Sequence, residues 1–191
     1  MAFYLASASP RRKELLAKAG IKDFSIRPAD VDEELDPSLL PHEAVMQLAS
    51  RKAEAAALDL TEDDWVLAAD TLVYLDNVAL GKPRDEEDAC SMLKALAGRS
   101  HEVYTGMCLK RGDICVCEYE CTRVFFSELT DEEIWAYIRT GEPMDKAGAY
   151  GVQGAAGAFI PRIEGDYYNV MGLPVSRLYK MLTRHGLELK L

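Results

Sequence analysis

Residues 65–69, with the sequence W-V-L-A-A, form a compact apolar run that ends abruptly at Asp70. A run of strand length that is apolar at every position is typical of an interior strand, because both of its faces must be buried. Helices cover both sides of such sheets, so the run predicts an α/β fold. Ligands of these folds bind at the carboxyl ends of strands, and Asp70 is therefore predicted to end an interior strand beside a ligand site.

The rest of the chain alternates between strand-like and helix-like segments. Residues 2–6 are a short apolar run, and Ser9 and Pro10 fit the N-cap and first position of a helix that ends at Ala19, before Gly20. The other expected elements are a strand at 24–28, a helix from 41 to about 58, a hairpin around Asp76 and Asn77, a helix at 85–97, strands at 101–110 and 114–126, a helix after Thr130, a Gly- and Ala-rich loop at 141–157, a strand near Phe159 and a helix at 174–185.

The size of the chain and its apolar segments predict one soluble folding unit. Its 191 residues, of which 49% are hydrophobic and 28% charged, are typical of a globular protein. No segment approaches the roughly 18 consecutive apolar residues of a membrane-spanning helix, and the N-terminus lacks the order of a signal peptide. We therefore expect a cytoplasmic protein with no membrane partner.

The charge of the chain disfavours polyanionic partners. The 32 acidic residues exceed the 22 basic residues and give a formal net charge of -10, so we do not expect the protein to bind nucleic acid. A small anionic ligand stays possible, because a few Arg and Lys in one cleft can set a local potential opposite to that of the whole protein.

The five cysteines are predicted to be buried, reduced thiols. They form an odd set with no C-x-x-C pair, and Cys115 and Cys117 alternate, so they should share one face of a strand. A zinc site would need more ligands than the three scattered histidines supply. The set comprises Cys90, Cys108, Cys115, Cys117 and Cys121.

Residues 9–13, with the sequence S-P-R-R-K, place three cations at the start of a predicted helix. The first turn of a helix carries a positive partial charge and normally favours Asp or Glu, so a bound anion would correct the imbalance. Free backbone N–H groups, the Ser7 hydroxyl and the guanidinium groups of Arg11 and Arg12 would together bind a phosphate. The alternative is a solvated basic turn, or one paired with the acidic segment at residues 30–36.

Asp70 and Glu33 are the candidate metal ligands. Two carboxylates, together with substrate phosphates and water, are the usual ligand set for Mg²⁺ in proteins. Asp70 could instead cap a turn, and Glu33 could belong to a solvated acidic loop.

Lys52 and Lys82 are candidate phosphate ligands. Lys52 lies on the otherwise apolar side of its predicted helix, so it must either extend to water or bind an anion. Lys82 lies between Gly81 and Pro83, directly after the predicted hairpin, although surface lysines are common.

Gln153 is the candidate for reading a nucleotide base. Gly151 and Gly154 flank it and would let the backbone approach a flat ligand, while the amide offers both a donor and an acceptor, as a pyrimidine edge requires. The alternative is a turn in which Gln153 faces solvent.

Several of these segments, taken in order, closely resemble the Maf family of nucleotide pyrophosphatases. They are L-A-S-A-S-P-R-R at 5–12, V-D-E at 31–33, the lysine helix at 52, A-A-D-T at 68–71, G-K-P at 81–83, G-A-Y-G-V-Q-G at 148–154 and N-V-M-G-L-P at 169–174. Ordered motifs at matching intervals are more specific than any single one. The resemblance covers nearly the whole chain and implies a single Maf-like domain at residues 1–191.

The resemblance implies hydrolysis of a nucleoside triphosphate to its monophosphate and pyrophosphate with a divalent cation, Mg²⁺ or Mn²⁺. It also implies a mixed twisted sheet flanked by helices, with two lobes around a central cleft as in inosine triphosphatases, and a homodimer. Asp70 matches the family's proton acceptor and, with Glu33, would hold the metal. The polar substrate positions of the cleft match Ser7, Arg11, Arg12, Lys52 and Lys82.

Arg12, Thr71 and Gln153 resemble the branch of the family that acts on dTTP and UTP. The other branch, acting on 7-methyl-GTP, usually carries Gln after the aspartate and Glu in place of the second amide. The family is also associated with inhibition of septum formation, so the alternative is a nucleotide-binding regulator of cell division with little turnover. An intact Asp70 favours an enzyme.

Overall fold

The computed structural model describes residues 1–34, 36 and 38–190. Within them, seven strands form one mixed sheet in the order β2-β1-β3-β5-β6-β7, and β4 pairs with β3 beside this path. β1 runs parallel to β2 and β3, and the other pairs are antiparallel. The strands are β1 (Phe3–Leu5), β2 (Ser25–Ile26), β3 (Trp65–Leu75), β4 (Val78–Leu80), β5 (Ser100–Arg111), β6 (Ile114–Phe125) and β7 (Arg162–Glu164).

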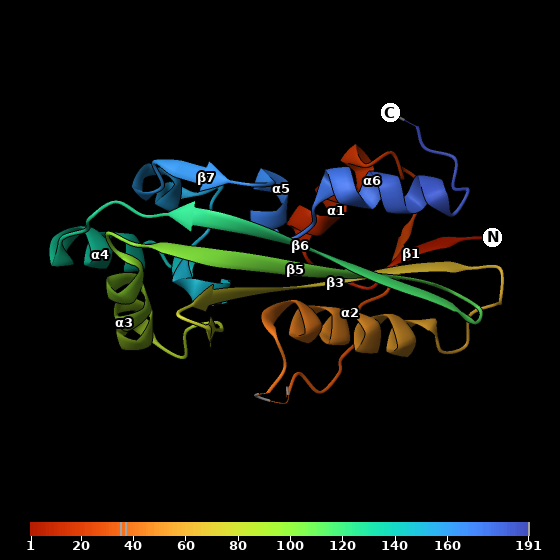
Figure 1. Ribbon diagram of the computed structural model, residues 1–191, viewed down its shortest axis with the longest axis horizontal. Helices are drawn as coiled ribbons and strands as arrows, with labels where there is room; N and C mark the ends of the chain where they lie inside the picture. The colour runs from red at the N-terminus through yellow and green to blue at the C-terminus, as the bar shows by residue number, and fades with distance from the viewer. Residues whose placement is uncertain (35, 37, 191) are drawn as a thin grey trace.

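Helices cover both faces of the sheet and confirm the predicted α/β class (Figure 1). At the end that carries β1, α1 and α6 lie on one face and α2 on the other, whereas α3 and α4 lie at the opposite end. The long strands β3, β5 and β6 join these two lobes. The helices are α1 (Pro10–Lys18), α2 (Pro41–Ala57), α3 (Glu86–Leu96), α4 (Asp131–Ile138), α5 (Tyr167–Val170) and α6 (Val175–Arg184), with short 3-10 helices η1 (Glu142–Asp145), η2 (Ala147–Ala149) and η3 (Ala155–Phe159).

The β3 strand accounts for the apolar run and corrects one prediction made from it. Successive residues of its first half face either the core beneath α1 and α6 or the core beneath α2, so both faces are buried. The strand does not stop at Asp70 but continues to Leu75, and the predicted strand end is therefore wrong. Asp70 lies in mid-strand opposite Gly106 of β5, where the long antiparallel pairing carries the strand onward.

One edge of β3 has two strand partners with an interval between them. β1 pairs with residues 65–67 and β4 pairs with residues 73–75, so neither strand covers residues 68–72 on that edge. Asp70 and Thr71 lie in this interval. Asp70 is thus beside the carboxyl end of a parallel strand after all, but the strand that ends there is β1.

The α2 helix approaches the centre of the sheet very closely. A Cβ atom added to Gly106 would lie 2.3 Å from the carbonyl oxygen of Val45 in α2. Since β5 Gly106 is also opposite Asp70, the missing side chain lets α2 pack directly over the interval in β3. This packing brings Lys52 of α2 to Asp70.

The other predicted elements are confirmed within a few residues, with three differences. The strand expected near Phe159 begins three residues later, at Arg162, and Phe159 ends η3. The loop expected at 141–157 contains the three 3-10 helices, and α5 was not predicted because a single helical turn has too few residues to show a period.

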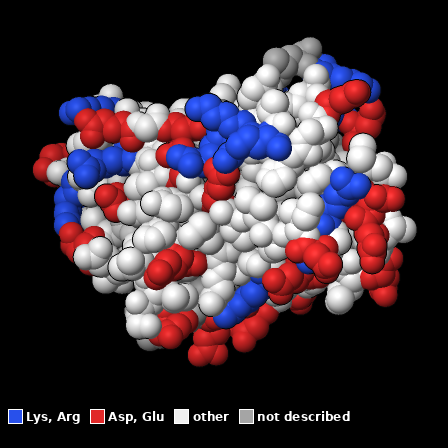
Figure 2. Space-filling model, turned by 45° about the vertical axis from the view of Figure 1, so that its right-hand side comes forward, with Lys and Arg blue, Asp and Glu red and all other residues white. Residues whose placement is uncertain are grey.

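Acidic side chains extend over much of the face drawn in Figure 2, and the basic ones form separate groups beside them. This distribution follows from the net charge of -10. Among the described residues, no helix is long and apolar enough to cross a membrane.

Candidate active site

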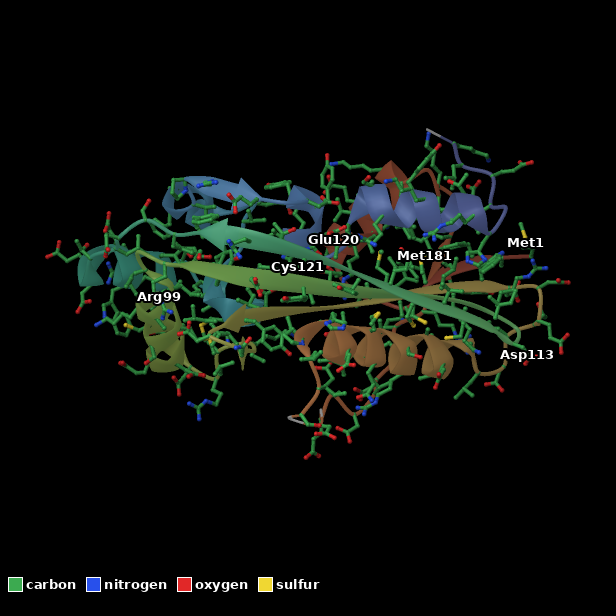
Figure 3. The ribbon with its side chains drawn as sticks, in the orientation of Figure 1. Met1, Arg99, Asp113, Glu120, Cys121 and Met181 are labelled. Atoms are coloured by element: carbon green, nitrogen blue, oxygen red, sulfur yellow. The ribbon has the colours of Figure 1, made fainter. Side chains whose placement is uncertain are left out.

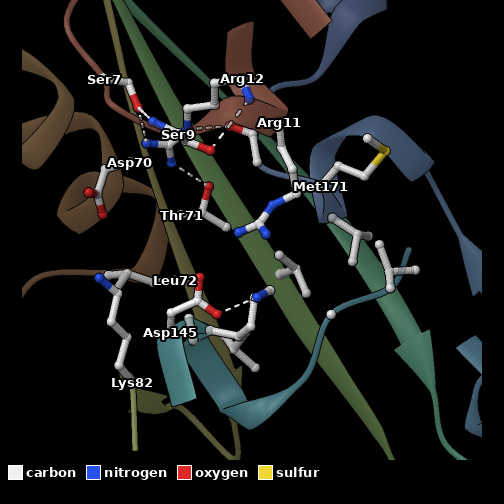
Figure 4. Close-up of a pocket in the computed structure, with 18 of the residues that line it drawn as sticks. Ser7, Ser9, Arg11, Arg12, Asp70, Thr71, Leu72, Lys82, Asp145 and Met171 are labelled. Carbon is white, nitrogen blue, oxygen red and sulfur yellow. Dashed lines mark hydrogen bonds and ion pairs between the residues drawn. The ribbon is translucent and has the colours of Figure 1, made fainter. Parts of the chain in front are cut away.

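A cleft of about 940 Å³ opens at the interval in β3 (Figure 4). One wall is formed by residues 7–12, at the start of α1, and the facing wall by residues 145–154, from the other lobe. Every predicted site residue lines this cleft, so the structure brings the whole predicted set together. The set consists of Ser7, Arg11, Arg12, Glu33, Lys52, Asp70, Thr71, Lys82 and Gln153.

Arg12 connects the first helix to the sheet and to the last part of the chain. Its Nε donates a hydrogen bond to the carbonyl oxygen of Gly172 at 2.8 Å, and its Nη2 donates to Thr71 Oγ1 at 3.0 Å. Its Nη1 donates to Ser7 Oγ at 3.4 Å. These three bonds use part of the guanidinium fork, and its other N–H donors stay available to a ligand.

The start of α1 has the predicted form of an anion site. Ser9 is the N-cap and accepts a hydrogen bond from the Arg12 backbone, Pro10 occupies the first turn, and that turn has no acidic residue. Arg11 lines the cleft, and within the described residues no ion pair neutralises its guanidinium or the ammonium of Lys82. The alternative interpretation, in which this turn pairs with the acidic segment, is therefore not seen for Arg11 among the described residues.

Lys52 binds both predicted carboxylates. Its Nζ lies 2.5 Å from Asp70 Oδ1 and 2.7 Å from Glu33 Oε1. Asp70 is only 7% exposed, so this ammonium compensates a carboxylate that the sheet removes from water. Lys52 therefore does not extend to solvent as the alternative reading required.

The pKa values of Lys52 and Glu33 move in the directions that keep this cluster charged. Burial acts to lower the pKa of Lys52, but attraction to Asp70 and hydrogen bonds to both carboxylates outweigh it and raise that pKa above its usual value. The hydrogen bond from Lys52 lowers the pKa of Glu33. The cleft thus contains a fixed positive charge between two carboxylates at neutral pH.

Thr105 is a site residue that the sequence did not reveal. Its hydroxyl is fully buried on β5, donates to the carbonyl oxygen of Asn169 at 3.0 Å and lies 2.9 Å from Thr71 Oγ1. Because the only proton of Thr105 Oγ1 is directed at Asn169, Thr71 must be the donor in the bond between the two threonines. Thr71 also accepts from Arg12, so it has no proton for a ligand and presents only a lone pair to the cleft.

The loop that carries Gln153 is positioned by Glu142 and Tyr137. Glu142 Oε2 accepts a hydrogen bond from the Ala155 backbone at 3.0 Å, and its Oε1 accepts from the Tyr137 hydroxyl at 2.9 Å. A Cβ atom at Gly154 would lie 2.0 Å from Glu142 Oε1. The Glu142 carboxylate thus lies directly against Gly154, whereas the prediction from the sequence assigned this glycine to close approach of a ligand.

Glu142, Asp145 and Lys146 also line the cleft and were not predicted. Asp145 forms an ion pair with Lys146, which lowers the pKa of the Asp145 carboxyl (Figure 4). These residues lie in a loop with no regular period, so only their charge could have drawn attention to them.

A comparison with known protein families identifies the chain. The sequence profile of a family described as Maf-like protein matches residues 2–185. The chain belongs to this Maf-like family. The resemblance inferred from the ordered motifs is thereby confirmed.

Individual relatives of the Maf-like chain carry enzyme names. The dTTP/UTP pyrophosphatase of Syntrophomonas wolfei is 52% identical over 184 residues, covering 95% of this chain and 96% of that protein. The dTTP/UTP pyrophosphatase of a Geobacillus species is 50% identical over 183 residues, covering 95% and 97%. A solved structure of a HAM1 protein from Coxiella burnetii shares the fold at a TM-score of 0.53 and 15% identity, covering 96% of this chain and 99% of that one.

A buried histidine supports one wall of the Maf-like cleft. His101 is 2% exposed, and its Nε2 lies 2.7 Å from the hydroxyl oxygen of Tyr150, which lines the cleft. Within the described residues its Nδ1 has no hydrogen-bond partner. Burial lowers the pKa of His101 to about 4, from 6.5.

We expect His101 to make the fold less stable in acid. In the unfolded chain the His101 imidazole is protonated below about pH 6.5, whereas in the folded protein its lowered pKa keeps it neutral down to about pH 4. The unfolding free energy should therefore fall between these values, by at most about 1.4 kcal/mol per pH unit from this residue. The measurement is urea denaturation at a series of pH values for the wild type and for His101→Gln, in which this part of the slope should be lost.

The control for this experiment is His42→Gln, which leaves His101 in place and should keep the wild-type slope. Equal slopes for the wild type and His101→Gln would contradict the assignment.

Proposed function

We propose that this Maf-like protein hydrolyses dTTP and UTP to the nucleoside monophosphate and pyrophosphate. The observation that carries the proposal is the pairing of buried Asp70 with Lys52 inside a cleft that is also lined by Arg11, Arg12 and Lys82. Relatives at about half identity over nearly their whole length bear the name dTTP/UTP pyrophosphatase. A net negative protein with such a cationic cleft suits a small polyanionic substrate.

The residues present suit a divalent metal cofactor. Glu33 and Asp70 direct carboxylate oxygens at a single cationic group, and hard oxygen donors with substrate phosphates are what Mg²⁺ or Mn²⁺ binds. We propose that these two carboxylates hold the metal. When bound, it would neutralise phosphate charge and polarise the phosphoryl group.

Asp70 is proposed as the proton acceptor. Lys52 occupies Oδ1, so the other carboxylate oxygen is the one that can orient a water molecule. The oxygen of this water attacks the α-phosphorus, the bond from that phosphorus to the bridging oxygen breaks, and pyrophosphate leaves. The proton of the water passes to Asp70.

The cations of the cleft are proposed to bind the triphosphate. Arg11 and the free N–H groups at the start of α1 suit one phosphate, and Lys82 approaches from the lobe on the other side of the cleft. Ser7 and Arg12 are already bonded to one another, so together they present a fixed donor surface. Charge that develops on the leaving pyrophosphate would be stabilised without rearrangement of these groups.

Base selection is proposed to depend on Thr71 and Gln153. Thr71 can only accept a hydrogen bond, so it suits the N3–H of uracil or thymine and rejects cytosine, whose N3 carries no proton. The Gln153 amide can serve a pyrimidine carbonyl as donor and an N–H as acceptor. A role as a regulator of septum formation with little turnover is not favoured, because the relatives are named as enzymes.

The homodimer, the cytoplasmic location, the single domain and the lack of nucleic-acid binding stay predictions from the sequence.

The reaction itself is tested by product analysis. Purified protein with Mg²⁺ or Mn²⁺ should convert dTTP and UTP to the monophosphate and pyrophosphate, since the water attacks the α-phosphorus. Phosphorus NMR distinguishes the products. Release of orthophosphate and a nucleoside diphosphate would place cleavage at the other bond and refute the proposal.

Replacing Asp70 with Asn tests the proton acceptor. The substitution keeps the size of the side chain but removes its basic oxygen, so kcat should fall by roughly 10²- to 10⁴-fold. Nucleotide binding, measured by calorimetry, should largely persist. A kcat within a few-fold of the wild type would move the role to another residue, with Glu33 the first to test.

Replacing Thr105 with Val tests whether the Thr71 hydroxyl can only accept a hydrogen bond from the base. The variant removes the acceptor of the Thr71 proton, so Thr71 can donate to the N3 of cytosine, while the Asn169 carbonyl keeps its bond from the Gly172 backbone. The ratio of kcat/KM for UTP over CTP should fall by roughly tenfold, which corresponds to about 1.4 kcal/mol.

The matched control is Thr122→Val, which removes another buried hydroxyl that does not contact Thr71. This control should keep the wild-type ratio. Equal ratios in all three proteins would show that Thr71 does not meet the base through this hydroxyl.

A further inference from the structure

Three cysteine sulfurs converge outside the cleft, on the β5–β6 hairpin. Cys108 of β5 is directly opposite Cys117 of β6, and Cys115 follows two residues away on the same face of β6. The Sγ atoms of Cys108 and Cys115 lie 3.2 Å apart, and all three sulfurs lie within 4.8 Å of one another. Figure 3 shows sulfur atoms between the hairpin and α2, toward the hairpin end marked by Asp113.

Hydrophobic packing explains the position of Cys108 and in part that of Cys117, but not that of Cys115. Cys108 is fully buried against the alanines of α2, but Cys115 is exposed and Cys117 is half-buried. The sequence-based prediction that all five cysteines are buried is therefore wrong for Cys115, and it holds only in part for Cys117 and Cys121, which are half-buried. All three lie on β6, which α2 covers less than it covers β3 and β5. The cluster opens to solvent through Cys115, so an ion can reach it.

We propose that Cys108, Cys115 and Cys117 form a binding site for a soft, thiophilic metal ion, Cu(I) in preference to Zn(II). Sulfurs that share an ion at a bond length of about 2.3 Å lie about 4 Å apart. The three sulfurs already lie within 4.8 Å of one another, and ion binding would require Cys108 and Cys115 to move apart from their present 3.2 Å. Thiolates select Cu(I) and Zn(II) over the harder ions that the cleft would bind. The two kinds of metal are thus directed to different places in the protein.

The number of donors favours Cu(I). Structural zinc sites have four protein ligands, whereas within the described residues this group contains three metal-ligating side chains and no fourth. Cu(I) forms stable three-coordinate, trigonal planar complexes with thiolates. Binding needs no change of oxidation state: each thiol loses its proton to solvent and each sulfur donates an electron pair to the ion.

Neighbouring residues of α2 complete the surroundings of the cluster. Ser50 Oγ lies 3.8 Å from Cys115 Sγ and donates a hydrogen bond to Glu54 Oε1 at 3.1 Å. The Cys115 thiol can donate to this hydroxyl, and once the thiol is deprotonated Ser50 could orient the thiolate only by turning its proton from Glu54 to the sulfur. None of the three cysteines lines the cleft, so the site is separate from the proposed pyrophosphatase centre.

The test is competition for Cu(I) between the reduced full-length protein and a chromogenic Cu(I) chelator under anaerobic conditions. We expect one Cu(I) per chain and three sulfur ligands by X-ray absorption spectroscopy. Cys115→Ser changes an exposed side chain and should preserve the fold, while the affinity for Cu(I) falls at least about 100-fold, more than the loss of an outer partner causes. Cys117→Ser should have the same effect.

The matched control is Cys121→Ser, on the same strand but outside the cluster, which should leave the affinity unchanged. An equal loss in this control, or no loss in Cys115→Ser and Cys117→Ser, would overturn the site. Tighter binding of Zn(II) than of Cu(I), measured in parallel, would overturn the choice of metal. Loss of two titratable thiols without bound metal would identify a cross-strand disulfide instead.

Discussion

The interval along one edge of β3 is the constraint on which the rest of the site depends. A strand in the middle of a sheet normally has partners along its whole length, and its backbone is then closed to ligands. Here β1 ends and β4 has not yet begun, so Asp70, Thr71 and Leu72 meet a cleft on one side while β5 still supports the strand on the other. Strand alternation then sends Asp70 toward α2 and Thr71 toward α1, and each meets a cation, Lys52 or Arg12.

The ammonium of Lys52 compensates the free-energy cost of burying the charged carboxylate of Asp70. A charge taken from water is unfavourable unless a partner compensates it, and here the partner also binds Glu33 from the acidic loop. A metal ion held by Glu33 and Asp70 would have to share these carboxylates with the Lys52 ammonium, and would bind through the lone pairs that Lys52 leaves free. Lys52 thus organises the carboxylates in the absence of substrate.

Much of the fold and the proposed site could be predicted from the sequence, because their signals are local. The N-cap serine and first proline of α1 are adjacent, the helical spacing lies within α2 itself, and each family motif is a short run of consecutive residues. The end of β3 was placed wrongly at Asp70, since a polar residue interrupts an apolar run in the same way whether a strand stops or a cleft opens there.

Contacts that depend on strand register could not be predicted. Thr105 reaches Thr71, and Cys108 reaches Cys117, only through pairings between strands that are far apart or joined by a turn. The carboxylate of Glu142 at Gly154 likewise depends on how an irregular loop folds back. A single sequence contains no signal for such pairings beyond the residue types themselves.

The bond from Arg12 to the Gly172 carbonyl spans 160 positions of the chain. During synthesis on a ribosome, Arg12 is added 160 residues before Gly172, its acceptor. The guanidinium therefore lacks this partner until residue 172 has been added. A nascent chain can bury much of its sheet before then, yet it acquires a completed phosphate-binding wall only when the closing segment arrives.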